Sequence, residues 1–87
     1  MDKQLELFLK AISEPTRMRI LKQLKKNTCV GDIWQCLDLP QNLVSHHLKV
    51  LKDAGLLTSE KCGLKVMYCL KDDVLKENIA KFNNYLK

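Results

Sequence analysis

Apolar side chains recur every three or four residues through much of this 87-residue chain, a spacing that predicts amphipathic helices. The first helix is expected over residues 4–12. A second starts near Pro15 or Thr16, because proline favours the first helical position, and ends near Asn27. The apolar positions that define these two helices are Leu5, Phe8, Leu9, Ile12, Met18, Ile20, Leu21 and Leu24.

Two further helices with a short connection are predicted in the middle of the chain. The third helix is expected over residues 30–37, with its N-cap at residue 28 or 29. Asp38-Leu39-Pro40 then makes a tight connection to a fourth helix over residues 41–54, for which Gly55 is the expected C-terminal cap. The positions expected to face inward are Ile33, Trp34, Leu37, Val44, His47, Leu48 and Leu51.

Between residues 56 and 70 the period of the pattern changes to two, which predicts strands. Residues 58–61 and 65–70 are expected to form a β-hairpin around Cys62-Gly63-Leu64, and a last helix follows over residues 72–86. The predicted fold is mainly α with a β-hairpin wing, in the order α-α-α-α-β-β-α. This order, with so short a turn before the fourth helix, is typical of a winged helix-turn-helix domain spanning residues 1–87.

The charge balance favours an anionic partner. Lys and Arg number 15 against 10 Asp and Glu, which gives a net charge of +5 and a pI near 9.1, as expected for a protein that binds nucleic acid or an acidic surface. No apolar stretch is long enough to span a membrane, and Met1-Asp2-Lys3-Gln4 does not begin a signal peptide. We therefore expect a cytoplasmic protein without a membrane partner.

Four segments of the chain carry motifs at rigid spacing. They are Ala-Ile-Ser-Glu-Pro-Thr-Arg-Met-Arg-Ile-Leu at 11–21, Cys-Val-Gly-Asp-Ile-Trp at 29–34, Leu-Pro-Gln-Asn-Leu-Val-Ser-His-His-Leu-Lys-Val-Leu-Lys-Asp-Ala-Gly-Leu-Leu at 39–57 and Val-Met-Tyr-Cys-Leu at 66–70. Together they closely resemble the ArsR/SmtB family of bacterial and archaeal repressors. The resemblance implies a homodimer, held by the helices near 4–12 and 72–86, that blocks transcription from a near-palindromic double-stranded DNA operator.

The fourth helix carries a polar face suited to reading DNA. Amide, hydroxyl, imidazole and ammonium groups lie opposite its apolar stripe, and such groups pair with base edges or phosphates. The DNA-binding residues predicted on this helix are Gln41, Asn42, Ser45, His46, His47 and Lys49. Gln41 and Asn42 are the expected base readers, because they occupy the first turn. His47 faces partly inward, so a packing role and a phosphate contact both remain open for it.

Two lysines flank the tip of the predicted hairpin. Lys61 and Lys65 are expected to contact the phosphate backbone or the minor groove, as wings of such folds do. The alternative is that both are ordinary solvated surface lysines.

Four cysteines raise the question of a signal. The arsenic-type members of the resembled family carry Cys-Val-Cys-Asp-Leu-Cys where this chain has Cys-Val-Gly-Asp-Ile-Trp, so of those thiols only Cys29 remains. The last helix lacks the His residues of the zinc-type site, and we expect no metal site and no cofactor. Cys29 at a predicted helix N-terminus is a possible sensor thiol, because the helix dipole stabilises a thiolate. Its second ligand would come from a partner subunit or a small thiol.

The other three cysteines are less suited to sensing. Cys36 lies seven residues after Cys29, roughly 10 Å along a helix, which is too far to share one ion, so we expect it to be a small buried side chain. Cys62 and Cys69 are offset by several residues around the hairpin, which argues against a disulfide between them.

Two other classes of function are compatible with a small basic domain to different degrees. A winged helix also serves as a protein-interaction module without specific DNA readout, and the apolar terminal helices must pack on something. An enzyme is disfavoured, because the chain shows no Gly-rich phosphate loop, no paired carboxylates and no nucleophile with a base at a suggestive spacing.

Overall fold

The computed structural model describes the whole chain except residue 28, and of residues 29 and 30 it describes the backbone alone. The elements in chain order are α1 (Lys3–Ile12), α2 (Pro15–Lys26), β1 (Cys29–Gly31), α3 (Ile33–Leu37), α4 (Gln41–Asp53), β2 (Leu57–Cys62), β3 (Lys65–Leu70) and α5 (Asp72–Tyr85). The expected helices and the hairpin wing are confirmed. One element, the short strand β1, was not expected.

Local side chains fix where several helices begin and end. The Asp2 carboxylate accepts a hydrogen bond from the backbone N–H of Leu5 at 2.7 Å and so caps α1. Glu14 caps α2 in the same way, and Pro15 follows it at the first helical position. After α4 the chain turns at Gly55, whose φ of +81° is the left-handed conformation expected of a residue that ends a helix.

The third helix is shorter than its apolar pattern predicts. Residues 29–31 form β1, and α3 begins only at Ile33, with Asp32 as its N-cap residue. The reason lies in β3, whose backbone pairs with β1 in antiparallel register and supplies hydrogen-bond partners that helical spacing cannot reveal. Gly31 suits this pairing, because a Cβ there would lie 2.9 Å from the sulfur of Met67.

The three strands form one antiparallel sheet in the order β1-β3-β2. The core lies where α2, α3 and α4 meet the base of this sheet, and its fully buried apolar side chains are Ile20, Leu24, Ile33, Val44, Leu51 and Leu56. Met18, expected on the buried stripe of the second helix, is 57% exposed. The core therefore holds the helix-turn-helix and the wing against each other.

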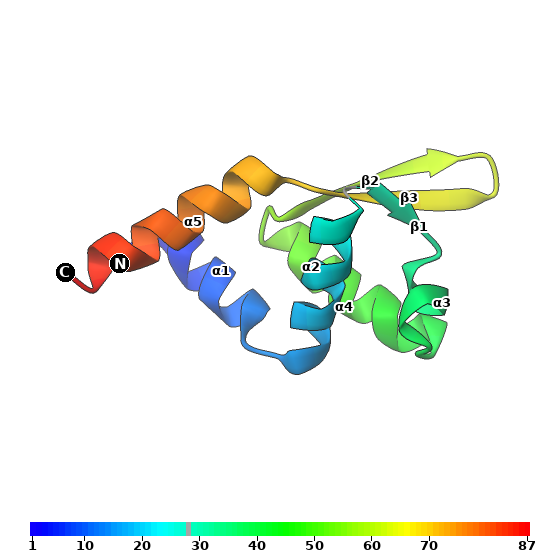
Figure 1. The fold of residues 1–87 in the computed structure, drawn as a ribbon, viewed down its shortest axis with the longest axis horizontal. Coiled ribbons are helices and arrows are strands. Elements are labelled where there is room, and N and C mark those ends of the chain that lie inside the picture. The colour runs from blue at the N-terminus through cyan, green and yellow to red at the C-terminus, as the bar shows by residue number, and fades with distance from the viewer. Residues whose placement is uncertain (28) are drawn as a thin grey trace.

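The molecule is elongated, with principal extents of 45 × 21 × 21 Å. Figure 1 shows α1 and α5 side by side at one end, where both termini lie, and α3 with the tip of the wing toward the other end. Over the described residues, no helix is long and apolar enough to cross a membrane. The two ends of the molecule thus differ in what they present to a partner.

Candidate nucleic-acid interface

The turn between α3 and α4 is a compact three-residue connection over 38–40. Asp38 adopts the left-handed conformation with φ of +53°, and the backbone N–H of Leu39 donates to the carbonyl of Trp34 at 3.2 Å. The next helix starts after Pro40, which makes no side-chain cap hydrogen bond, so the positive end of the α4 dipole is not compensated by a capping side chain. These features define a helix-turn-helix whose second helix begins without a capping side chain, at an end where a negative charge is favoured.

The polar face expected on α4 is largely present in the structure. Val44, Leu48 and Leu51 are buried against the core, and the opposite face is exposed. The predicted DNA-binding residues that lie on this exposed face are Gln41, Asn42, Ser45, His46 and Lys49. Lys49 is held in an exposed ion pair with Asp53 at 3.2 Å, a contact weak enough for the ammonium to exchange it for a phosphate.

The half of the wing nearest its tip lies beside the first turns of α4. A cavity of about 120 Å³ separates them and is lined by Gln41 and Ser45 from α4 and by Val66 and Tyr68 from β3, among others. The elements therefore form a continuous surface from the exposed face of α4 to the strand β3.

The wing tip carries the two predicted lysines on exposed positions. Lys61 lies near the end of β2 and Lys65 is the first residue of β3. The turn between these strands contains Gly63, which has a φ of +64°. The side chain of Leu64 at this turn is fully exposed. Lys65 lies 3.9 Å from the carboxylate of Asp32, a long and solvent-exposed pairing that leaves its charge available.

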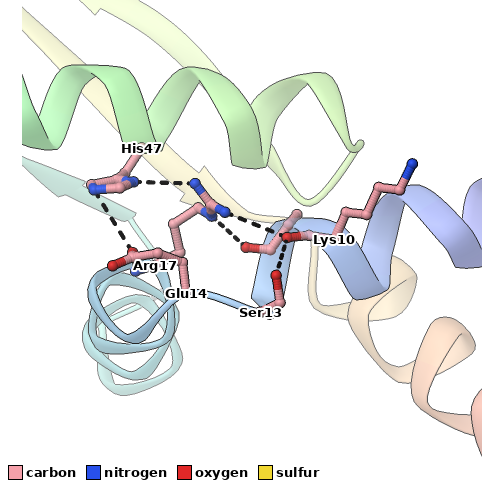
Figure 2. Close-up of polar contacts among 6 residues, drawn as sticks. Lys10, Ser13, Glu14, Arg17 and His47 are labelled. Carbon is pink, nitrogen blue, oxygen red and sulfur yellow. Dashed lines mark hydrogen bonds and ion pairs between the residues drawn. The ribbon is translucent and has the colours of Figure 1, made fainter.

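His47 does not share the exposure of its neighbours. It is 7% exposed, and its two ring nitrogens face Arg17 and Glu14, as Figure 2 shows. The Arg17 guanidinium lies 3.3 Å from Nδ1, and the Glu14 carboxylate lies 3.7 Å from Nε2. Because an arginine can only donate, a hydrogen bond between these two groups requires Nδ1 to be the acceptor. This geometry fits the packing role that the sequence left open.

Arg17 also contacts the end of α1. Its Nε donates to the carbonyl of Ala11 at 2.6 Å, and its Nη2 donates to the carbonyl of Lys10 at 3.4 Å. The guanidinium therefore supplies hydrogen bonds to carbonyls at the C-terminal end of α1, where a positive charge is favoured. Partial burial works to raise the pKa of Glu14, but hydrogen bonds from backbone N–H groups, that of Arg17 first, lower it below its ordinary value.

Sequence reasoning assigned no role to Glu14 or Arg17. Pro15 marks the start of α2 in the sequence, but glutamate is not one of the usual N-cap residues, so the pattern did not indicate that Glu14 caps this helix. Nothing in the periodicity indicates that Arg17 bridges α1 and α4, because its partners are six and 30 residues away.

The cysteines match their expected states only in part. Cys36 is exposed with a free thiol, so the expectation of a buried side chain is wrong, because α3 turns this position outward. Cys62 is also free, which confirms that it does not bond to Cys69, whereas Cys69 is disulfide-bonded. Among the described residues, no three His, Cys, Asp or Glu side chains cluster in a way that could hold a metal ion.

The proposed sensor Cys29 lies at a position whose side chain is outside the described part of the structure. Its backbone is in β1, three residues before the cap of α3. The predicted thiolate stabilisation by a helix N-terminus therefore has no structural basis, since no helix begins there.

A helix-turn-helix with an exposed polar second helix, packed beside a β-hairpin wing, defines a winged helix DNA-binding protein. The model of the family described as bacterial regulatory protein, arsR family, matches residues 14–59, more than half of the chain. The chain belongs to the ArsR family, and the resemblance found in its motifs is confirmed. Its relatives are DNA-binding transcription regulators rather than enzymes.

Two relatives and one solved structure illustrate the match. The HTH-type transcriptional repressor SmtB of Mycobacterium tuberculosis is 45% identical over 66 residues, which are 75% of this chain and 49% of that protein, so the chain spans about half its length. The HTH-type transcriptional regulator MJ1325 of Methanocaldococcus jannaschii is 44% identical over 80 residues, 90% of this chain and 89% of the relative. HlyU from Vibrio cholerae superposes with a TM-score of 0.77 at 27% identity, over all of both chains.

Proposed function

We propose that this protein is a homodimeric transcription repressor that binds a near-palindromic operator by placing α4 in the major groove. The observation that carries the proposal is the exposed first turn of α4, where Gln41 and Asn42 are both exposed and Gln41 lines the cavity that faces the tip half of the wing. Both amides can donate and accept at once, and such side chains pair with the two hydrogen-bonding groups at the major-groove edge of adenine. They are therefore the proposed base readers.

The other exposed residues complete the proposed contact surface. Ser45, His46 and Lys49 follow along the same face of α4 and contact phosphates or neighbouring bases. Lys61 and Lys65 at the wing contact the phosphate backbone. We assign His47 no DNA contact, because both of its ring nitrogens already face protein groups.

An uncovered apolar stripe supports the homodimer. Ile79 and Phe82 on α5 and Leu86 at its C-cap are 47%, 37% and 66% exposed, although their spacing is that of a buried helix face. The stripe lies at the end of the molecule remote from the wing tip, where α5 packs beside α1 (Figure 1). A second copy of the chain that covers this stripe would present two α4 helices, which is why a near-palindromic operator is proposed.

The test is a selection of bound fragments from random double-stranded DNA, followed by affinity measurements on the selected operator. Gln41→Ala and Asn42→Ala should each weaken specific binding by about 1–3 kcal/mol, roughly 5- to 150-fold, and relax the sequence preference. Asn84→Ala is the matched control, because it removes an exposed amide from α5 at the opposite end of the molecule, and it should leave the affinity unchanged.

The salt dependence separates base contacts from phosphate contacts. Lys61→Ala and Lys65→Ala should weaken binding to all sequences alike, and each should lower the slope of log affinity against log salt by about 1. Changes at Gln41 and Asn42 should leave this slope unaltered. If DNA binding proves insensitive to these two residues and to Ser45, the proposal fails and a protein-interaction module becomes the better description.

A further inference from the structure

The wing ends in a two-residue turn whose second position is apolar. Cys62 and Lys65 are the last Cα partners in the register of β2 and β3, so Gly63-Leu64 is the whole loop. Gly63 has a positive φ and Leu64 does not, which matches a type II′ turn with glycine at its first central position. The second position of such turns is commonly Asn, Asp or Ser. The turn therefore does not require the apolar side chain of Leu64.

Leu64 belongs to the face of the wing that is turned toward α4. Leu64, Val66 and Tyr68 alternate along the chain, and alternate residues of a strand share a face. All three line the cavity that Gln41 and Ser45 line from α4. Their exposure rises toward the tip: Tyr68 is half-buried, Val66 is 37% exposed and Leu64 is fully exposed. These three residues form a wing ridge whose end is uncovered.

Lysines border the uncovered end of the wing ridge. Lys61 is the Cα partner of Val66, so it shares the face of the ridge. Lys65 follows Leu64 and lies on the other face, and both lysines are exposed. Figure 1 shows the wing tip as the outermost point of the molecule at the end remote from the termini. An uncovered apolar side chain between two cations, at such a projection, suits a groove bordered by phosphates.

We propose that Leu64 is an apolar wedge that inserts between two base pairs from the minor groove and kinks the operator. Its place on DNA rests on the proposed function, in which α4 occupies the adjacent major groove. Leucine is among the side chains that DNA-bending proteins insert between base steps, and insertion removes its apolar surface from water. Lys61 and Lys65 meet the phosphates on the two sides of the groove.

The wedge gives the protein a second way to select its operator. Unstacking a base step costs least at the flexible pyrimidine–purine steps TA and CA/TG, and it costs more in a stiff A-tract. Leu64 makes no hydrogen bond to a base, so it selects the step by how easily the step deforms. The selected operator should therefore carry a pyrimidine–purine step beneath each wing, outside the bases that Gln41 and Asn42 contact.

The experiment compares Leu64→Ala, which removes the wedge, with Leu64→Met, which keeps a long apolar side chain. Because Leu64 is fully exposed, both variants of the full chain should melt within about 4 °C of the wild type. Energy transfer between the ends of the selected operator measures its bend. The wild type and Leu64→Met should bend it by about 20° or more, and Leu64→Ala should lose this bend. Met18→Ala, which removes an exposed apolar side chain from α2, is the matched control and should leave the bend unchanged.

Two further measurements separate a wedge from a surface contact. A 2-aminopurine base at the step beneath the wing should fluoresce more strongly when the wild type unstacks it, but not with Leu64→Ala. The wild type should prefer a TA step there about tenfold over a step within an A-tract, and Leu64→Ala should reduce this preference to about twofold. Leu64→Ala removes no charge, so the slope of log affinity against log salt should stay the same.

The wedge is overturned if the wild type binds its operator without bending it or unstacking a base. It is also overturned if Leu64→Ala keeps the bend and the step preference, or if Leu64→Met loses them as Leu64→Ala does. In each of these cases sequence-specific binding persists and the proposed function stands. A wild type that shows no preference among DNA sequences would overturn the proposed function, and the wedge with it.

Discussion

The side chain of Arg17 on α2 contacts both α1 and α4, and replacing it should lower the stability of the fold. Arg17→Met keeps most of the apolar stem but removes the guanidinium. Three contacts disappear: those to the carbonyls of Ala11 and Lys10 and the one to Nδ1 of His47. Their lengths of 2.6, 3.4 and 3.3 Å indicate that the first is the strong one.

The size of the stability loss depends on which hydrogen-bond acceptors are left without a donor. The Lys10 carbonyl still accepts from the Ser13 hydroxyl at 2.8 Å, so its loss is small. The Ala11 carbonyl belongs to a buried residue and loses a charged donor, which costs about 1–3 kcal/mol. We therefore expect Arg17→Met to lower the free energy of unfolding by about 2 kcal/mol and, for a domain of this size, the melting temperature by roughly 10 °C.

Urea unfolding followed by circular dichroism measures this change. The control is Lys22→Met, which removes an exposed cation from the same helix and should alter stability by less than about 0.5 kcal/mol. Equal losses in the two variants would refute the reasoning, because they would show that only charge matters at position 17.

The same cluster should also affect how α4 is held for DNA. His47→Asn keeps an acceptor near the position of Nδ1, whereas His47→Leu keeps the burial but removes the acceptor that faces Arg17. We expect the Asn variant to bind the operator more tightly than the Leu variant, as measured by fluorescence anisotropy at a temperature where both are folded. The opposite order would argue that His47 acts only by filling space.

Three further predictions concern other parts of the fold. Phe82→Glu should place a charge in the uncovered stripe of α5 and convert a dimer to a monomer, as measured by analytical ultracentrifugation. Asn84→Glu, on the opposite side of the helix, should leave the dimer intact. A monomeric wild type would contradict the dimer. Asn78→Leu should raise the free energy of unfolding by about 1 kcal/mol in urea titrations, because the buried side-chain oxygen of Asn78 has no partner among the described residues; a loss of stability would point to a partner in the dimer. The hydrogen bond from Lys25 holds the pKa of Asp72 below its ordinary value. The pair therefore stabilises the fold at pH values above the ordinary pKa, and this stabilisation is lost as the pH falls through the lowered pKa. Lys25→Gln should therefore lower the urea midpoint at neutral pH and matter less in acid, and an equal effect at both would exclude this linkage.

The chain's local patterns determined most of the architecture. Apolar spacing, the proline at the start of α2, the glycine after α4 and the change of period at residue 56 are all short-range signals, and they located the helices and the hairpin to within a few residues. The same spacing sorted α4 into a buried face and an exposed polar one, because both faces repeat at the helical period.

The tertiary structure decided what depends on partners distant in sequence. Residues 29–31 became a strand because β3, nearly 40 residues later, pairs with their backbone, and this pairing brought Cys29 opposite Cys69. His47 is buried with its ring nitrogens facing Arg17 of α2 and Glu14 at the N-cap of that helix, contacts that its own position in the helical pattern does not reveal. Helical periodicity reports only which side of an element faces inward. Hydrogen bonds between elements are settled only when the elements pack.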